Sequence, residues 1–410
     1  MAGTEFITGL DIGTTKIGVI IAEVSEGELP KIVGVGTAPS EGLRKGVVVN
    51  LEKTVRSIEL AVEKAEQMAG IQVNQVYVGI AGDHIRSYNG RGVVAVAGPD
   101  NEITEDDVRR AIDAAKAVVM PIDREIIHII PQEFIVDDQR GIKDPLGMSG
   151  VRLETEVHIV TGAITSAQNI IRSVERAGFD VKDLVLEPLA SSYSVLSDDE
   201  KELGVVVMDV GGGTTDIAMF FEGCIRHTAV VALGGGNVTH DIALCLRTPL
   251  DQAELVKRKA GLVLHTHLKG KESTVEIPGV GDRPPRRVAQ ELLVDIINPR
   301  MEEIFRLAAG EIRKSEFANM MTAGLVITGG GAMLPGAVEL AEEVFDMPVK
   351  LGIPKGFVGL IDLAQSPIHA TGVGLILYAV NGRSELDGIL NEGEIGLFDR
   401  VWERMKGWFS

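Results

Sequence analysis

The chain has 410 residues; 45% are hydrophobic, 24% are charged and only 4% are aromatic, which is the composition of a globular protein with mainly aliphatic cores. That length is sufficient for two domains or more. The formal net charge of −19 argues against nucleic acid as a main ligand and against attraction of the whole surface to anionic lipid.

The cysteines and the amino terminus indicate a reduced, cytosolic protein. Cys224 and Cys245 lack the Cys-x-x-Cys spacing of redox and zinc motifs. The chain does not open with a basic region followed by an apolar run, so we expect no signal peptide. No uninterrupted apolar stretch reaches the ~18 residues that a membrane span requires. Any contact with a membrane is therefore expected to be peripheral.

The amino-terminal part of the chain predicts strands followed by a helix. The helical pattern runs from Asn50, a suitable N-cap, to Gly70, a suitable residue just after a helix end. This β-then-α order has the potential to form a parallel sheet. The expected strands are 6–12, 17–24, 32–36 and 76–81.

From about His84 the pattern changes, and we interpret residues 83–165 as an inserted subdomain. Thr104 is a suitable N-cap for its one clear helix, and acidic residues fill the first turn of that helix, where the helix dipole favours them. A helix over 165–178 and a strand over 181–187 are expected to follow. The expected strands of the insertion are 92–97, 126–136 and 152–162.

The second half begins near Gly204 with the fully apolar strand 205–208, which is typical of the centre of a buried sheet. Residues 266–286 are polar and contain two adjacent prolines, so they predict a loop or an edge hairpin. A last strand is expected over 325–328. The helical patterns cover 238–262, 287–317 and 370–380, the last of them ending at Asn381 or Gly382.

Three glycine-rich turns predict one nucleotide site. The first two share a pattern of apolar strand, Asp, apolar residue, glycine and Thr-Thr about two hundred residues apart, which indicates two related domains that face a common ligand. Glycine lets successive backbone amides approach one phosphate, and threonine hydroxyls add donors. The three turns are Gly9–Lys16, Met208–Asp216 and Thr328–Met333.

The residue types at these turns suit a nucleotide with Mg²⁺. Asp11 and Asp209, one from each half, are expected to hold Mg²⁺ through water, and Lys16 to neutralise phosphate charge. A single such turn could equally be an ordinary tight hairpin. The residues expected around the β- and γ-phosphates are Gly13, Thr14, Thr15, Gly211, Gly212, Gly213, Thr214 and Thr215. Those expected beside the adenosine are Gly329, Gly330, Gly331, Ala332 and Met333.

Other candidate site residues lie between and after these turns. Glu187, just after a strand, could orient the attacking water in γ-phosphate hydrolysis, or be a surface acid. The turn with Gly235, Gly236 and Asn237 can approach ribose or phosphate. Glu254 and Lys257 share a helical face and could bracket a ribose or base, or form an i, i+3 ion pair. The histidines show no metal spacing, and we expect them to be structural or solvated.

The last fourteen residues, 397–410, predict an amphipathic helix after a polar, acidic linker over 381–394. Both tryptophans of the protein lie there, beside basic residues, which suits the bilayer interface. A helix packed on the body or on a partner helix is the alternative. The apolar residues, which fall within roughly 140° of a helical wheel, are Leu397, Phe398, Val401, Trp402, Met405, Trp408 and Phe409.

With these motifs in order, the chain resembles the actin/DnaK-type chaperone/sugar-kinase superfamily, and more closely the FtsA family of bacterial actin-like cell-division proteins. Two further elements of the superfamily are Leu186–Ala190 and Ser366–Gly374. The strings that look like FtsA lie mainly in the insertion: Pro131–Asp137, Gly141–Glu154 and His158–Gly162, with Val280–Arg286 and Asn298–Arg300 later in the chain.

The resemblance implies a two-lobed α/β actin-like ATPase fold with ATP and Mg²⁺ between the lobes, each lobe being a duplicated RNase H-like core. The division of the chain that it implies is 1–82 with 166–200 and 366–380 (first-lobe core), 83–165 (inserted FtsA-type α+β subdomain), 201–238 with 324–365 (second-lobe core), 239–323 (its small subdomain), 381–394 (linker) and 395–410 (membrane-targeting helix).

The resemblance also implies partners and a location. FtsA polymerises and tethers FtsZ filaments to the cytoplasmic side of the bacterial inner membrane at the division site, and other division proteins join it. The FtsZ C-terminal tail is expected on the small subdomain around Arg300, although Asn298 stands where Glu is common. Anionic lipid is the expected partner of the last helix, and self-assembly the expected source of avidity. ATPase activity is expected to be slow at most.

Two rivals from other classes share the superfamily. A sugar kinase would match the Gly9–Lys16 turn, but such repressor-type kinases usually carry a Cys-rich zinc motif, which two isolated cysteines cannot supply. A chaperone ATPase would need a substrate-binding domain after the nucleotide domain, and the given sequence ends too soon for one.

Overall fold

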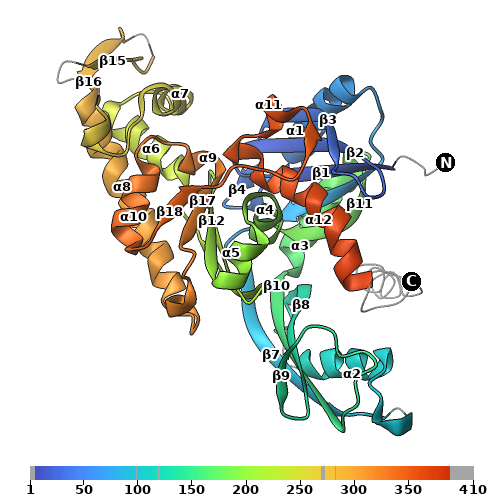
Figure 1. Cartoon of the computed structure of the whole chain (residues 1–410). Coiled ribbons are helices and arrows are strands. Elements are labelled where there is room, and N and C mark those ends of the chain that lie inside the picture. Colours follow the sequence, from blue (N-terminus) through green and yellow to red (C-terminus); the bar gives the residue numbers. More distant parts are fainter. Residues whose placement is uncertain (1–4, 98, 118–120, 269–272, 282, 388–410) are drawn as a thin grey trace.

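The computed structural model describes residues 5–97, 99–117, 121–268, 273–281 and 283–387. They form two α/β lobes, an inserted subdomain that extends from the first lobe, and a helical subdomain on the second lobe (Figure 1). This is the two-lobed α/β arrangement that the sequence predicted. No helix among the described residues is long and apolar enough to cross a membrane.

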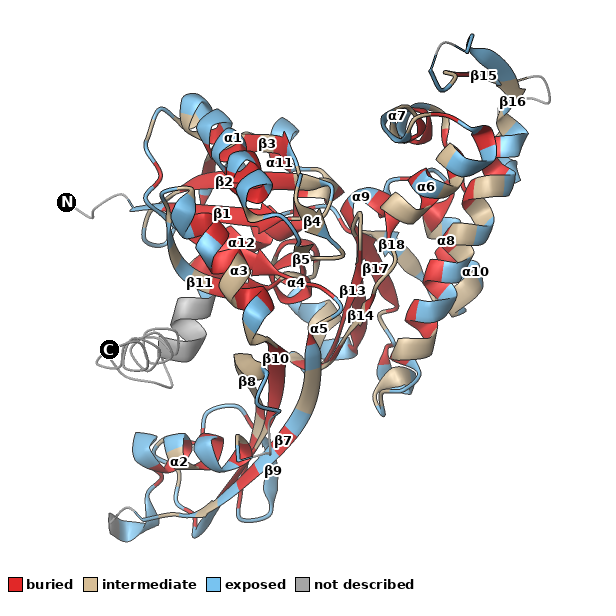
Figure 2. Ribbon diagram, turned by 180° about the vertical axis from the view of Figure 1, so that it is seen from behind, coloured by how far each residue is buried: buried red, intermediate tan, exposed pale blue. Residues whose placement is uncertain are grey.

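The first lobe is built on a six-stranded sheet in the order β11-β6-β1-β2-β3-β19. Its central strands are apolar on both faces, because helices cover both sides and leave the sheet centre buried (Figure 2). The strands are β1 (Glu5–Ile12), β2 (Lys16–Val24), β3 (Lys31–Pro39), β6 (Gln75–Ile80), β11 (Asp180–Leu186) and β19 (Val358–Gly359), with the small pair β4 (Leu43–Arg44) and β5 (Val47–Val48) beside them. The helices are α1 (Leu51–Ala69), α3 (Ile164–Arg176), α4 (Glu187–Val195), α11 (Ile361–Ala364) and α12 (Ala370–Asp387).

The second lobe repeats the topology of the first. Its sheet order, β14-β13-β12-β17-β18, corresponds to β3-β2-β1-β6-β11, with the same antiparallel meander followed by parallel strands. This agreement confirms the duplication that the two related glycine turns predicted. The strands are β12 (Val205–Val210), β13 (Thr215–Phe221), β14 (Cys224–Val231), β17 (Leu325–Thr328) and β18 (Val349–Leu351), and the helices are α5 (Asp198–Leu203), α9 (Gly329–Ala332) and α10 (Ala337–Phe345).

The small subdomain of the second lobe packs its helices around an aliphatic core. One continuous helix was expected over 238–262, and that prediction was wrong. The segment breaks into two helices because Arg247 adopts a left-handed backbone (φ 47°) and Pro249 cannot continue a helix that reaches Thr248. The elements are α6 (Gly235–Leu246), α7 (Leu250–Ala260) and α8 (Gln290–Ile312), with the hairpin β15 (Thr274–Ile277) and β16 (Arg286–Ala289) at the tip.

The insertion is a four-stranded sheet, ordered β7-β10-β8-β9, with α2 on one face. The expected Thr104 cap is present: its hydroxyl accepts a hydrogen bond from Asp107 N–H, and the Asp107 carboxylate accepts one from Thr104 N–H. The elements are β7 (Arg86–Ala95), α2 (Glu105–Ala115), β8 (Arg124–Val136), β9 (Gln139–Ile142) and β10 (Arg152–Ala163).

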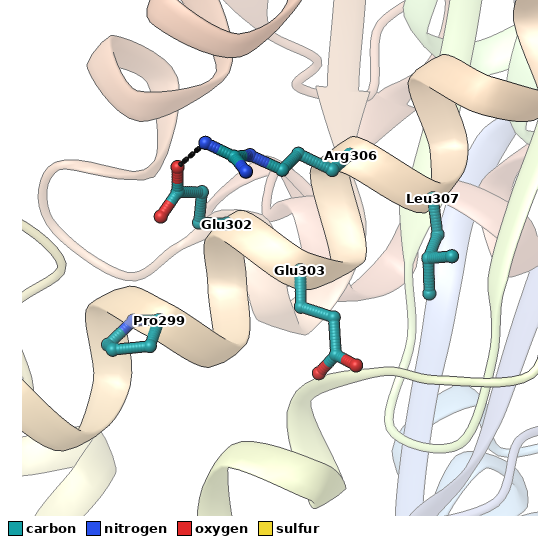
Figure 3. Close-up of a pocket in the computed structure, with 5 residues that line it drawn as sticks. All are labelled: Pro299, Glu302, Glu303, Arg306 and Leu307. Carbon is teal, nitrogen blue, oxygen red and sulfur yellow. Dashed lines mark ion pairs between the residues drawn. The ribbon is translucent and has the colours of Figure 1, made fainter.

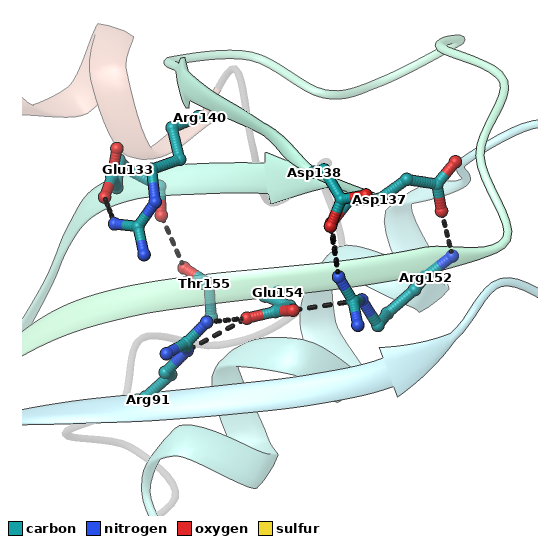
Figure 4. A network of polar contacts seen from close by, with 8 residues as sticks. All are labelled: Arg91, Glu133, Asp137, Asp138, Arg140, Arg152, Glu154 and Thr155. Atoms are coloured by element: carbon teal, nitrogen blue, oxygen red, sulfur yellow. Dashed lines mark hydrogen bonds and ion pairs between the residues drawn. The ribbon is translucent and has the colours of Figure 1, made fainter.

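The sheet face opposite α2 carries a network of ion pairs (Figure 4). The buried Glu154 carboxylate accepts from Arg91 Nε at 2.9 Å and lies 3.0 Å from Arg152 Nε. Arg140 pairs with Glu133 farther along the same face. A buried carboxylate between two guanidiniums is a satisfied charge, so the network holds β7, β8, β9 and β10 together.

The inner end of the insertion is hydrogen-bonded to the second lobe. Asn89 Nδ2 donates to Arg226 O at 3.3 Å, and Gln132 Nε2 donates to Ile225 O at 2.7 Å. The His158 ring lies 2.8 Å from Asn89 Oδ1 and 3.1 Å from Thr228 Oγ1. These polar contacts form an insertion–lobe seam, defined here by Asn89, Gln132, His158 and Thr228, so the insertion bridges both lobes.

The closing helix differs from its expected length. It was expected over 370–380, with an end at Asn381 or Gly382, but α12 continues to Asp387. A glycine lowers helix stability by only about 1 kcal/mol relative to alanine, so it does not by itself end a helix whose preceding turns pack on β1, β2 and α4. The expected linker therefore begins as helix. The expected membrane-targeting helix, 395–410, lies outside the described residues.

Candidate functional site

The first two glycine turns, Gly9–Lys16 and Met208–Asp216, called the phosphate turns here after their predicted role, lie against each other between the lobes. A Cβ atom added to Gly212 would lie 2.4 Å from Thr15 Cγ2, and one added to Gly213 would lie 2.5 Å from Thr14 Oγ1. Only glycine permits this approach of one turn to the other. The prediction that the first two glycine turns, far apart in sequence, face one another is therefore confirmed by these contacts.

Two more glycine turns join the same site. Gly235 N–H donates to Gly211 O at 2.8 Å, and Gly236 N–H donates to Gly212 O at 2.7 Å. At the third turn, Gly329 has φ +83°, and a Cβ there would lie 2.2 Å from Asp209 Oδ1. The sequence expected the Gly235–Asn237 turn and the Gly329–Met333 turn near the ligand, and the structure places both beside the second phosphate turn.

Four carboxylates, of which Asp11 and Asp216 are buried and Asp209 and Glu187 half-buried, gather around the two turns, and the charge of Lys16 acts on all of them except Asp216. Asp11 is the next-to-last residue of β1, Asp209 lies on β12, Asp216 is the second residue of β13 and Glu187 begins α4. Burial raises the pKa of Asp11 to about 6 and that of Asp216 to about 7, with mutual repulsion among the acids as a further cause. The pKa of Glu187 is likewise raised, first by burial and then by Asp11, Asp216 and Asp209.

Lys16 lies among these acids without satisfying them. Its ammonium donates to Ile368 O at 2.6 Å, and burial lowers its pKa. One ammonium group cannot balance four carboxylates, so the site as built by the protein favours binding of additional positive charge.

The residues present fit a hydrated divalent cation. No described residue donates a hydrogen bond to the buried carboxylate of Asp11, and Asp216 Oδ1 is buried without a partner. Among the described residues, no three His, Cys, Asp or Glu side chains converge on one point as direct ligands would. Carboxylate oxygens without a protein donor suit Mg²⁺ that keeps its own water molecules, as Mg²⁺ usually does.

Glu187 is not the surface acid that the sequence left open as an alternative. It is half-buried at the first turn of α4, and a Cβ added to Gly79 would lie 3.1 Å from Glu187 Cγ. Its burial with the three aspartates places it where a water-orienting acid would be needed. Its catalytic role remains a prediction.

Glu254 and Lys257 form the ion pair that the sequence gave as one of two possibilities. Lys257 Nζ lies 2.7 Å from Glu254 Oε2 and donates to Thr239 Oγ1 at 2.8 Å and Gly235 O at 2.9 Å. The pair therefore fastens α7 to the start of α6, next to the Gly235 turn. A role in holding the ribose or base remains a prediction.

Sequence reasoning gave no site role to three polar residues: Ser191; Thr371, which lies within the Ser366–Gly374 element; and Asp216, which ends the Met208–Asp216 turn. Ser191 Oγ donates to Asp209 Oδ2 at 2.9 Å, and Thr371 Oγ1 donates to the same atom at 3.2 Å. Asp216 could have been found, since it faces Asp209 in the β12–β13 register. Ser191 and Thr371 lie on separate helices, so no local pattern predicted that they meet at Asp209.

Arg300, around which the sequence predicted a partner site, is engaged within the protein. Its guanidinium donates to Asp241 Oδ2 at 2.6 Å and to Asp241 Oδ1 at 3.2 Å, and it also pairs with Glu303. A pocket of about 320 Å³ lies beside it on α8, lined by Pro299, Glu302, Glu303, Arg306 and Leu307 (Figure 3).

Comparison with protein-family models gives two matches in this chain. Residues 82–161 match the family described as "SHS2 domain inserted in FTSA", and residues 206–374 match "Cell division protein FtsA". The first range corresponds to the inserted subdomain, and the second covers most of the second lobe.

Curated relatives match along nearly the whole chain. The chain is 48% identical over 408 residues to the cell division protein FtsA of Pseudomonas aeruginosa, a match that covers 98% of the chain and 97% of that relative. It is 40% identical over 394 residues to FtsA of Escherichia coli K12, covering 93% of each. The Bacillus subtilis FtsA is 40% identical and is covered to 84% of its length.

Solved structures share the fold at low sequence identity. A structure described as the PilM–PilN type IV pilus biogenesis complex matches with a TM-score of 0.66 and 16% identity, covering 91% of this chain and 98% of that one. MreB5 of Spiroplasma citri bound to ADP matches with a TM-score of 0.57 and 13% identity, covering 93% and 98%. The MreB5 structure bound to AMPPNP has the same score.

Proposed function

The chain belongs to the FtsA family of bacterial cell division proteins, and from this premise we propose that it binds Mg²⁺-ATP between its lobes and assembles into filaments that tether FtsZ to the cytoplasmic face of the membrane. The observation that carries the nucleotide part is the contact of two phosphate turns from different lobes beside four buried or half-buried carboxylates and one lysine. Other division proteins would join this assembly at the division site.

The phosphate turns and the acids have distinct roles in this proposal. Backbone amides of Gly13, Gly212 and Gly213 would surround the phosphates, and Lys16 would neutralise part of their charge. Asp11 and Asp209 would hold the waters of Mg²⁺, which when bound balances phosphate and carboxylate charge alike. Glu187 would orient a water at the γ-phosphate. Hydrolysis would be slow at most, since the same arrangement serves binding alone.

Removing one of the two metal-facing acids tests this proposal. We expect Asp209→Ala to weaken Mg²⁺-ATP binding at least tenfold in isothermal titration calorimetry, because the charge that attracts hydrated Mg²⁺ is lost. Asp362→Ala, which removes an exposed carboxylate on α11, is the matched control and is expected to bind as the unaltered protein does. Equal affinity in all three proteins would remove Asp209 from the site.

The pocket on α8 supports a site for the FtsZ C-terminal tail. It combines the apolar surfaces of Pro299 and Leu307 with three charged side chains, and Leu307 is 46% exposed although it is a large apolar residue. An exposed apolar side chain in a pocket with a charged rim is a common feature of peptide-binding sites. Arg300 would support this site indirectly, because its bonds to Asp241 hold α8 against α6.

Membrane attachment in this proposal depends on the last fourteen residues, which lie outside the described part of the chain. The body is strongly acidic, so attraction to anionic lipid must be local to this segment with its two tryptophans and its basic residues. One such segment would bind weakly, and several on one filament would bind by avidity.

A sugar kinase of the same fold is the alternative in another class. It shares the phosphate turns but has no use for an aromatic carboxyl-terminal segment. Release of ADP that depends on an added sugar would favour the kinase, whereas release that is slow and independent of sugars favours the filament protein.

A further inference from the structure

A pair of buried hydroxyls crosses from the first lobe to the second at Asp209. Ser191 lies on α4 and Thr371 on α12, both elements of the first lobe, whereas Asp209 lies on β12 of the second. Ser191 is fully buried and Thr371 is 5% exposed. The two hydroxyl oxygens are 3.1 Å apart, so the pair forms one compact donor group.

Both hydroxyls act on the same oxygen of the carboxylate. Ser191 Oγ lies 2.9 Å and Thr371 Oγ1 lies 3.2 Å from Asp209 Oδ2, and each hydroxyl has one proton to donate. No described residue donates a hydrogen bond to the other oxygen, Oδ1, which lies beside the backbone of Gly329. The carboxylate is therefore held in one orientation, with one oxygen saturated and the other available.

The hydrogen bond from Ser191 to Asp209 is not the one that a serine within a helix usually makes. A serine within a helix commonly donates back to a carbonyl of the preceding turn, and Ser192 does so by donating to Leu189 O at 2.7 Å. Ser191, the adjacent residue, instead donates out of its helix to the carboxylate of another lobe. A carbonyl of its own helix would also satisfy the buried Ser191 hydroxyl, so burial alone does not explain the bond to Asp209.

The helices that carry the pair are fixed relative to each other. A Cβ atom added to Gly374 would lie 1.9 Å from Ala190 O, so α12 and α4 touch through their backbones one residue from Ser191. The two donors thus come from a rigid crossing, which lets them orient a third group with little loss of side-chain freedom.

We propose that Ser191 and Thr371 are positioning residues that aim Asp209 Oδ1 at the hydrated cation of the nucleotide site. This inference rests on the proposed binding of Mg²⁺-ATP. The pair sets the direction of the carboxylate, and through it the affinity for the cation, without touching nucleotide. Because it joins the lobes at the same atom, cation binding and the relative placement of the lobes depend on one another here.

The test separates binding of the cation from binding of the nucleotide. A fluorescent ATP analogue is titrated into each protein in EDTA, and then at increasing free Mg²⁺. In Ser191→Ala, in Thr371→Val and in the double variant, we expect the free Mg²⁺ for half-maximal enhancement of binding to rise, by about tenfold in the double variant, while affinity in EDTA is unchanged. Thr371→Ser keeps the hydroxyl and should restore the original Mg²⁺ requirement.

The matched control is Ser192→Ala, which removes a buried hydroxyl of the same helix that donates only to its own helix. It should leave the Mg²⁺ requirement unchanged even if it lowers the thermal midpoint as much as Ser191→Ala. An unchanged requirement in the double variant, or an equal change in Ser192→Ala, would overturn the inference. If the unaltered protein itself fails to bind the analogue, the proposed function is what fails.

Discussion

At the scale of single residues, the site could be predicted where its signal is local. Asp11 and Asp209 each follow an apolar strand and precede a glycine turn, and this spacing alone was sufficient to place them in the site. Ser191 and Thr371 could not be found in this way, because they meet Asp209 from helices 18 and 162 residues away in sequence. The ion pair of Lys257 and Glu254 was one of two open interpretations, since a spacing of three fits both an ion pair and a ligand site.

His158 in the insertion–lobe seam makes stability depend on pH. Burial lowers its pKa to about 3, and the neighbouring His227 and His128 lower it further. Below about pH 6.5 the unfolded chain binds a proton at this residue and the folded chain does not. The stabilising contribution of His158 to the free energy of unfolding is therefore complete above pH 6.5 and is lost as the pH falls.

We therefore expect the stability difference between the unaltered protein and His158→Gln to shrink by roughly 2 kcal/mol between pH 7.5 and pH 5. Urea unfolding at the two pH values measures it, and contributions of the buried carboxylates cancel in the difference. His240→Gln, at an exposed histidine, is the control and should show no such change. A difference that is constant with pH would show that His158 is protonated in the folded protein.

At the scale of elements, strands and helix starts could be predicted better than helix ends. The Asn50 and Thr104 caps and the first Gly-rich hairpins are local signals, and the structure confirms them. The break at Pro249 was available in the sequence and was outweighed by the apolar periodicity on both sides of it. The extension of α12 depends on packing against other elements, which periodicity does not report.

The close crossing of α4 and α12 predicts that substitution of Gly374 destabilises the protein. We expect Gly374→Ala to lower the free energy of unfolding by about 2–3 kcal/mol, because its Cβ would lie 1.9 Å from Ala190 O and both backbones must shift. Urea unfolding of purified protein at pH 7.5 measures the loss.

Gly310→Ala is the matched control within another helix. A Cβ there meets no atom within 4 Å, so the same substitution in α8 is expected to raise stability by about 0.5–1 kcal/mol through helix propensity. Equal changes in the free energy of unfolding for Gly374→Ala and Gly310→Ala would show that the backbones of α4 and α12 are not in close contact at Gly374.

At the scale of the whole molecule, the insertion is the feature that departs most from a plain pair of lobes. It projects from the first lobe and is hydrogen-bonded to the second, while the small subdomain lies at the opposite end (Figure 1). The sequence predicted the insertion from its change of pattern, but not the seam, whose partners are 70 to 137 residues apart. The proposed nucleotide site between the lobes and the contacts made by the insertion are thereby physically connected.

The pocket on α8 gives a test of the proposed partner. We expect Leu307→Lys to weaken binding of an FtsZ C-terminal tail peptide at least tenfold in fluorescence anisotropy, because a desolvated charge replaces an exposed apolar contact. Leu292→Lys changes a similarly exposed leucine of the same helix outside the pocket and should bind within twofold of the unaltered protein. Comparable losses of peptide affinity in both variants would show that the pocket on α8 is not the binding site.

The central claim is that nucleotide and the carboxyl-terminal segment together drive assembly on a membrane. Electron microscopy of the protein on a monolayer containing anionic lipid tests it most directly, with and without ATP, and with and without residues 397–410. We predict filaments only where the full chain and ATP are both present, and none on the monolayer after the segment is removed. Filaments that form on lipid equally well without ATP or without residues 397–410 would show that assembly on the membrane does not require both.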